Sequence, residues 1–184
     1  WGEPKISKPV ESSDTYQTLS YDFSSARDAS GNEIDYSKVT QVWLFFNMGG
    51  VAYSGEVSID NFKIGSEVVS DDNNTGYSYI WESNTEGWWN SAGNQTHLVS
   101  HEDGALKVVV DKTNASWDFI GTNNFGTLDL SLYPYVSFDI KTNADIENLY
   151  VVFIDENKNS NRDQFFWGEP KISKPVESSD TYQT

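Results

Sequence analysis

Residues 42–65 read VWLFFNMGGVAYSGEVSIDNFKIG. This stretch holds short apolar runs separated by glycines, and its apolar residues do not recur at the i, i+3, i+4, i+7 spacing of an amphipathic helix. It predicts two β-strands, Thr40–Asn47 and Gly55–Ile64. The same pattern of short apolar runs broken by Gly, Asn, Asp and Ser continues through the chain, which predicts an all-β protein.

Nine more strands are expected from the same signals, and the segments Ser24–Val39 and Gly65–Gly76 are expected to be polar connections. Eleven strands in 184 residues imply one domain built as a two-sheet antiparallel β-sandwich. The nine strands are Lys5–Ile6, Gln17–Phe23, Ser78–Glu82, His97–Ser100, Ala105–Val110, Ser116–Gly121, Tyr135–Thr142, Leu149–Asp155 and Gln164–Ser173.

One segment of the chain is duplicated. Trp1–Thr18 reads WGEPKISKPVESSDTYQT, and Trp167–Thr184 repeats the same eighteen letters, so 166 residues are unique. This period is far longer than that of a solenoid repeat, so the repeating unit is a whole domain. Eighteen residues cannot bury a core alone. The second copy must therefore compete with the first for one position, pair with another molecule, or hang free.

The chain is strongly acidic, with a formal net charge of −16. This charge repels phosphate backbones and anionic lipid headgroups, so neither nucleic acid nor membrane is expected as a partner. It suits an extracellular or cell-surface protein that meets neutral polymers or binds cations, and plain solubility explains it equally well. No cysteine is present, and any export signal would lie outside this sequence.

Tryptophan offers the clearest candidate for a binding surface, because sugar rings stack on flat aromatic faces. In the predicted strand Gln164–Ser173, alternation places Trp167, Glu169 and Lys171 on one face, and Trp1 is the duplicate of Trp167. We expect this face to bind carbohydrate, with a partly buried Trp at the sheet rim as the alternative.

The other tryptophans are expected either at the surface or in the core. Trp89 is expected to face solvent beside a buried Trp88, Trp117 could lie in either the core or a cleft, and Trp81 is expected to pack internally. Trp43 is expected in the core, although Gln41 and Asn47 on its face could bind sugar hydroxyls.

Several motifs together resemble a known family. Taken from the polar segment 65–77 onward and then round to the front of the chain, their order is similar to that of jelly-roll carbohydrate-binding modules of families 4, 11 and 16. The match covers essentially the whole 166-residue unit. The motifs are IWESNTEGWW (Ile80–Trp89), GALKVVV (Gly104–Val110), LDLSLYPYVSFDIKTN (Leu128–Asn143), the hairpin LYVVFIDENKNSNRDQFFWG (Leu149–Gly168) and the closing IDNFKIG (Ile59–Gly65).

This resemblance implies a galactose-binding-like jelly roll that binds a neutral polysaccharide or oligosaccharide without catalysis. It implies that the chain is circularly permuted near Phe166, with a native module boundary at 65–77. It also implies a structural Ca²⁺ between the opening and closing strands, held by Glu82 and Asp60 with a contribution from Asp103. A separate stretch, Asp155–Asp163, has the alternating oxygen spacing of a calcium loop but lacks its glycine and bidentate glutamate, which favours a solvated hairpin tip.

No enzymatic motif is evident. His97 and His101 flank LVS without a serine or aspartate pattern, and no metal-protease, nucleophile-elbow or phosphate-loop sequence occurs. We therefore expect a binding module and not an enzyme. The alternative is a structural repeat unit, or an engineered permutant, that assembles by exchange of the duplicated strand.

Overall fold

The computed structural model describes residues 13–24, 37–46, 53–66, 75–90, 97–112, 119–143, 146 and 149–155. These residues form ten β-strands and contain no helix. The strands are β1 (Ser13–Asp22), β2 (Val39–Phe46), β3 (Tyr53–Gly65), β4 (Thr75–Tyr79), β5 (Trp89–Asn90), β6 (His97–Glu102), β7 (Ala105–Lys112), β8 (Phe119–Thr122), β9 (Tyr135–Thr142) and β10 (Leu149–Asp155).

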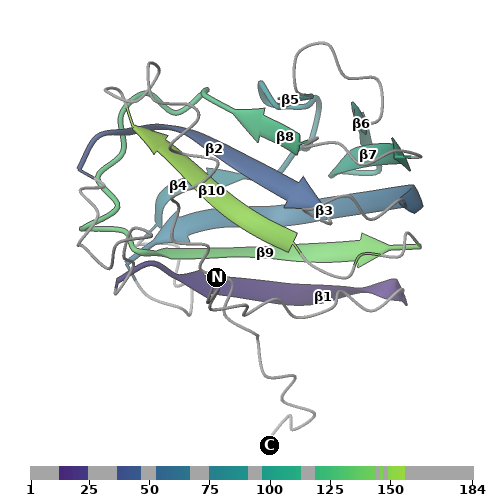
Figure 1. Cartoon of the computed structure of the whole chain (residues 1–184), viewed down its shortest axis with the longest axis horizontal. Helices are drawn as coiled ribbons and strands as arrows, with labels where there is room; N and C mark the ends of the chain where they lie inside the picture. The colour runs from purple at the N-terminus through teal and green to yellow at the C-terminus, as the bar shows by residue number, and fades with distance from the viewer. Residues whose placement is uncertain are drawn as a thin grey trace, which may run out of the picture.

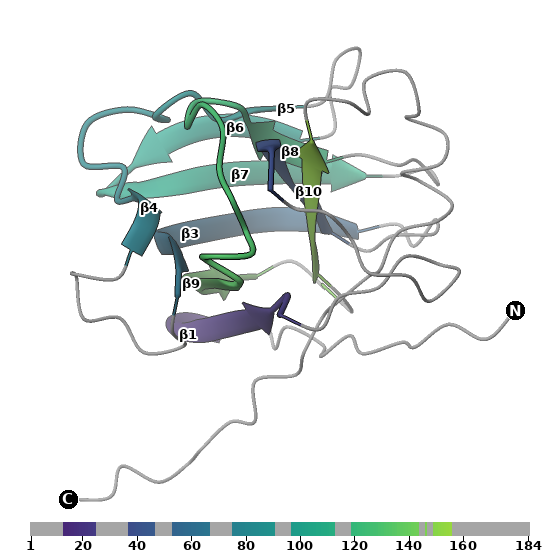
Figure 2. The same cartoon turned by 90° about the vertical axis from the view of Figure 1, so that its left-hand side faces the viewer.

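The strands form two antiparallel sheets, which confirms the predicted all-β fold and is consistent with a β-sandwich (Figures 1 and 2). The large sheet has the order β1-β9-β3-β7-β6, and β4 pairs with the far end of β3. The small sheet has the order β10-β2-β8-β5. Strands distant in sequence, such as β1 and β9, therefore lie side by side in the large sheet.

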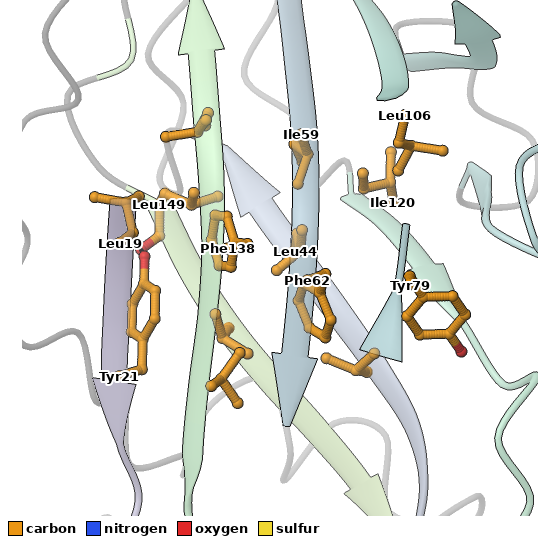
Figure 3. Packing of buried hydrophobic residues seen from close by; sticks show 14 of the residues in the cluster. Leu19, Tyr21, Leu44, Ile59, Phe62, Tyr79, Leu106, Ile120, Phe138 and Leu149 are labelled. Carbon is orange, nitrogen blue, oxygen red and sulfur yellow. Dashed lines mark hydrogen bonds between the residues drawn. The ribbon is translucent and has the colours of Figure 1, made fainter. Parts of the chain in front are cut away.

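The main core fills the space between the two sheets, because each strand turns alternate residues inward. In β9, burial alternates strictly along YVSFDIKT, with Val136, Phe138 and Ile140 inward. Figure 3 labels Phe138 of β9 among the packed core residues, together with Leu44 and Leu149 of the small sheet. Phe138 stacks on Phe62 with ring centroids 5.6 Å apart and on Tyr21 at 5.8 Å.

A buried hydrogen bond joins the two sheets at one side of the sandwich. The hydroxyl of Tyr21 in β1 donates to the carbonyl oxygen of Leu149 at the start of β10, at 3.1 Å (Figure 3). Burial raises the pKa of this phenol, so it remains a donor across the usual pH range. The two edge strands β1 and β10 therefore lie close together where β10 begins.

A second apolar cluster lies on the opposite face of the small sheet. It consists of Trp43, Phe45, Phe119, Val152 and Ile154, with Trp89 and Tyr150 packed against it. Because the other face of this sheet contributes to the main core, β2 and β10 are buried on both sides. Trp43 is buried as predicted, at 2% exposure, but belongs to this outer cluster and not to the main core.

Some predicted strand boundaries were wrong. The strand expected at Ser78–Glu82 is β4, which begins at Thr75 and ends at Tyr79. Trp81 has a φ of 46°, in the left-handed region that interrupts a regular strand, and its fully buried side chain packs in the core as predicted. The short strand β5 was not predicted. The strands expected at Lys5–Ile6 and, near the C-terminus, at Gln164–Ser173 lie outside the described residues.

The first copy of the duplicated segment contributes to the large sheet. Its last six residues, Ser13–Thr18, open β1, where Thr18 pairs with Asp139 of β9. The predicted boundary segment 65–77 links β3 to β4, which pair antiparallel, so its two ends lie in one sheet. A circular permutation would join the two native termini within this segment, and this requires that they lie close together. The boundary itself stays a prediction.

Candidate functional site

A groove of about 390 Å³ opens on the outer face of the large sheet. Its walls come from β1, β3, β7 and β9 and from the turn between β6 and β7. These lining residues are almost all polar or charged, and the one aromatic side chain among them is Tyr16. The groove therefore offers one flat apolar surface surrounded by hydrogen-bonding groups.

The strand register aligns the groove residues in a row that crosses the sheet. Ser58 in β3 is the pairing partner of Lys141 in β9 on one side and of Lys107 in β7 on the other. Lys107 in turn pairs with Ser100 in β6. Tyr16 in β1 completes the row, because the ammonium of Lys141 lies 5.0 Å from the centroid of its ring. Five neighbouring strands span roughly 19 Å at about 4.8 Å per step, so an extended ligand fits along this row.

Tyr16 is the aromatic platform of the groove. Its side chain is 43% exposed, so a ring face is open to a ligand even though Lys141 lies over part of it. Partial burial raises the pKa of its phenol, the charge of Asp60 raises it further, and a hydrogen bond with Ser58 acts in the opposite direction. The hydroxyl is therefore protonated at neutral pH and can donate a hydrogen bond.

Lys107 is held in the floor of the groove by two carboxylates. Its ammonium lies 3.3 Å from Glu56 Oε1 and donates a hydrogen bond to Glu102. These contacts, the bond with Glu102 foremost, raise the pKa of Lys107. The backbone of Glu56 is fixed by Asn143, whose Oδ1 accepts from the Glu56 N–H at 2.7 Å. The charged groups of the floor therefore restrain one another before any ligand arrives.

A tight turn presents Asp103 at one end of the groove. Asp103 and Gly104 have φ values of 53° and 75°, and the flanking residues Glu102 and Ala105 pair across the hairpin. Positive φ at both central positions is the geometry of a two-residue type I′ turn, for which Asp-Gly is a favoured sequence. The turn directs β6 and β7 into register and places a carboxylate at the groove.

Asp60, one of the carboxylates predicted to hold calcium, lies on the large sheet beside Asp139, which was not predicted. Asp60 and Asp139 are cross-strand partners, and Asn61 donates its backbone N–H to Asp60 at 2.7 Å and its side-chain amide to Asp139 at 2.9 Å. Thr18 donates to Asp139 at 2.6 Å. Burial raises the pKa of Asp60, the negative charges of Asp139 and Glu82 add to this effect, and the Asn61 N–H opposes it.

These oxygens only partly suit a calcium ion, which takes six to eight oxygen ligands. The structure brings Asp60 close enough to Glu82 for their charges to interact, whereas Asp103 belongs to the groove. Among the described residues, no three His, Cys, Asp or Glu side chains form a cluster that could hold a metal. Calcium at Asp60 and Glu82 therefore stays a prediction.

Two of the residues expected to bind carbohydrate lie on the small sheet, away from the groove. Trp89 in β5 is partly buried against Phe119, at 5.9 Å between centroids, while Trp88 is buried in the core. The side-chain oxygen of Gln41 accepts a hydrogen bond from Trp43 Nε1 at 3.0 Å. The remaining predicted site residues lie outside the described residues: Trp1, Asn47, Trp117, Trp167, Glu169 and Lys171.

Sequence reasoning did not identify Tyr16, Ser58, Lys107 and Lys141. The strand predicted from the sequence begins at Gln17, one residue after Tyr16, so its alternation does not include Tyr16. The Asp103-Gly104 dipeptide between two short apolar runs was the available signal for the adjoining hairpin.

Comparison of the chain with family models, curated proteins and solved structures found no match. Within the described ranges, no helix is long and apolar enough to cross a membrane.

Proposed function

We propose that this protein binds a neutral polysaccharide along the groove of the large sheet and catalyses no reaction on it. The observation that carries the proposal is the exposed Tyr16 ring at one end of a row of hydroxyl, ammonium and carboxylate groups that crosses the sheet. Sugar chains combine C–H faces that stack on aromatic rings with hydroxyls that need polar partners.

The charge of the groove favours a neutral ligand over an acidic one. Four carboxylates, those of Asp14, Glu56, Glu102 and Asp103, line it together with two lysines. Lys107 is already engaged by Glu56 and Glu102. A uronic acid or a sulfated sugar would meet a net negative surface on a protein whose formal net charge is −16. A neutral glycan avoids this repulsion and can donate its hydroxyls to the carboxylates.

The test is a pair of matched variants. Tyr16→Ala is combined with Tyr182→Ala, because Tyr182 is the second copy of Tyr16 and could take its place. Loss of a stacking aromatic should weaken binding to a neutral glucan or mannan by about 1 to 3 kcal/mol, or roughly 5- to 150-fold in Kd. Tyr135→Ala is the control, since Tyr135 lies at the opposite end of β9. Equal affinities of the Tyr16/Tyr182 variant and the unmodified chain, measured by isothermal titration, would refute the groove as the site.

The tryptophan face predicted from the sequence is a second part of the same proposal. Trp1 and Trp167, with Glu169 and Lys171, would extend the binding surface, and an unchanged affinity of the double variant Trp1→Ala/Trp167→Ala would exclude them. The proposal also includes an extracellular or cell-surface location, which suits a protein that meets polysaccharide, and a structural calcium ion at Asp60 and Glu82.

A further inference from the structure

The floor of the groove holds one hydrogen-bond donor between two acceptors. The ammonium of Lys107 lies 3.3 Å from Glu56 Oε1 and donates a hydrogen bond to Glu102. The side chain of Lys107 is 21% exposed, whereas those of Glu56 and Glu102 are 53% and 54% exposed. Both carboxylates therefore remain open to a ligand while they hold the ammonium in place.

The strand register places the two carboxylates on opposite sides of Lys107. In β7, Lys107 lies between Ala105 and Val109, and alternate residues of a strand share one face. Glu102 in β6 is the cross-strand partner of Ala105, and Glu56 in β3 is the partner of Val109. The carboxylates therefore reach the ammonium from opposite directions along β7.

The backbone at Glu56 is anchored to the end of β9. The Glu56 N–H donates to Asn143 Oδ1 at 2.7 Å. The Glu56 carbonyl oxygen accepts from Thr142 Oγ1 at 2.9 Å and from the Asn143 N–H at 3.2 Å. A binding group that is already held in position loses less conformational freedom when a ligand arrives.

The ammonium of Lys107 has capacity for one more hydrogen bond. A lysine ammonium carries three N–H donors and no acceptor. Among the described residues, the structure shows two partners for this ammonium, Glu56 and Glu102, so one donor is left for a ligand. Hydrogen bonds that involve a charged group are stronger than those between neutral groups. The three side chains thus offer a ligand one charged donor beside charged acceptors.

Two adjacent hydroxyls on a sugar ring have the complementary pattern, because each hydroxyl can both accept and donate a hydrogen bond. One hydroxyl accepts from the Lys107 ammonium while its neighbour donates to Glu56 or Glu102. The 3.3 Å between Lys107 Nζ and Glu56 Oε1 is close to the spacing of such hydroxyl oxygens. A lone hydroxyl that bonded to both of these atoms would do so at a sharp angle, which weakens hydrogen bonds.

We propose that Lys107, Glu56 and Glu102 recognise adjacent free hydroxyls, so that the groove selects glycans whose interior residues keep such a pair. This selection rests on the proposed binding of a neutral polysaccharide in the same groove. Cellohexaose and mannohexaose keep the pair, because their linkages leave two neighbouring ring hydroxyls free. Laminarihexaose has the same glucose units as cellohexaose, but its linkage occupies one member of the pair in each interior residue.

Isothermal titration of the unmodified chain with these three sugars tests the selection without any variant. A site built to bond a hydroxyl discriminates against a ligand that lacks it. Cellohexaose or mannohexaose should bind at least about tenfold more tightly than laminarihexaose. If laminarihexaose binds as tightly as both of the others, or more tightly, the selection is overturned and the proposed function stands. Binding of none of the three would overturn the proposed function and the selection together.

A variant of Lys107 then assigns the discrimination to this side chain. Lys107→Met removes the ammonium and keeps an unbranched chain, so it should weaken binding of the preferred sugar by about tenfold or more and affect laminarihexaose less. Tyr16→Ala/Tyr182→Ala removes the stacking surface and should weaken both sugars by similar factors.

Lys63→Met is the matched control, because Lys63 lies in the part of β3 that pairs with β4, and it should leave both affinities unchanged. An undiminished preference in Lys107→Met, or an equal loss for both sugars, would contradict the role of Lys107. If Lys107→Met does not fold, the comparison of the three sugars on the unmodified chain still decides the selection.

Discussion

Gly121 in β8 occupies a position where no side chain fits. It pairs with Trp43 on one side and with Trp89 on the other. A Cβ added at Gly121 would lie 2.6 Å from Trp43 Cδ1 and 2.9 Å from the carbonyl oxygen of Val42, both below normal contact distance. Gly121→Ala therefore forces the indole or the strand to move, and overpacking of this kind costs about 1 to 3 kcal/mol.

Part of this cost is recovered, because alanine is about 0.5 to 1 kcal/mol better than glycine inside a strand. The net loss in the free energy of unfolding should be about 0.5 to 2 kcal/mol. For a chain of this size, that loss lowers Tm by about 1 to 8 °C. Urea unfolding followed by tryptophan fluorescence measures the free energy directly.

A double-mutant cycle separates the indole clash from other effects. In a Trp43→Val background the indole is gone, so Gly121→Ala should cost at least about 0.5 kcal/mol less than in the unmodified chain. Gly126→Ala is the control: Gly126 has open space around it and should show no coupling to Trp43. If Gly121→Ala is as stable as the unmodified chain, or shows no coupling to Trp43, the packed outer cluster is refuted.

Three further predictions concern stability. The raised pKa of Asp60 means that the folded state favours the protonated carboxyl. The stability that this group contributes is therefore present at low pH and is lost as the pH rises through the pKa of the folded state. Asp60→Asn should therefore raise Tm at pH 7, and the gain in Tm should disappear in acid. The exposed Asp111→Asn is the control. A gain in Tm equal to that of the control, or one that does not depend on pH, would contradict this prediction. Tyr21→Phe leaves the buried Leu149 carbonyl without its donor and should cost about 1 kcal/mol or more in denaturant unfolding, and no measurable loss would show that the bond is unimportant. If calcium binds at Asp60 and Glu82, a chelator should lower Tm in the unmodified chain but not in Asp60→Asn. Equal changes in Tm for the two chains, measured by calorimetry, would rule out this pair as the site.

The sequence predicted the fold class better than the site, for physical reasons. Short apolar runs and glycine-rich turns depend on local chemistry, so strands such as β1 and β9 could be located from the chain alone. The apolar run around Trp43 could not be resolved further, because continuous apolar sequence does not show which residues face the main core and which face a second cluster.

The groove could not be predicted because its residues come together only through strand order. Tyr16 and Lys141 are distant in sequence and meet because β1 pairs with β9, and Ser58 joins them because β9 also pairs with β3. No local pattern encodes that order. Among the tryptophans expected as platforms, Trp89 lies within the described residues and is partly buried, whereas Trp43, Trp81 and Trp88 are buried as predicted.

The most direct test of the proposed function is an NMR titration of the ¹⁵N-labelled chain with soluble oligosaccharides of neutral glucans and mannans. The account predicts that at least one of them shifts the amides of Tyr16, Ser58 and Lys107 together, in a saturable manner, while Tyr135 at the far end of β9 is unaffected. Saturable shifts confined to another surface, or no response to any of these sugars, would contradict the claim that this groove binds a neutral polysaccharide.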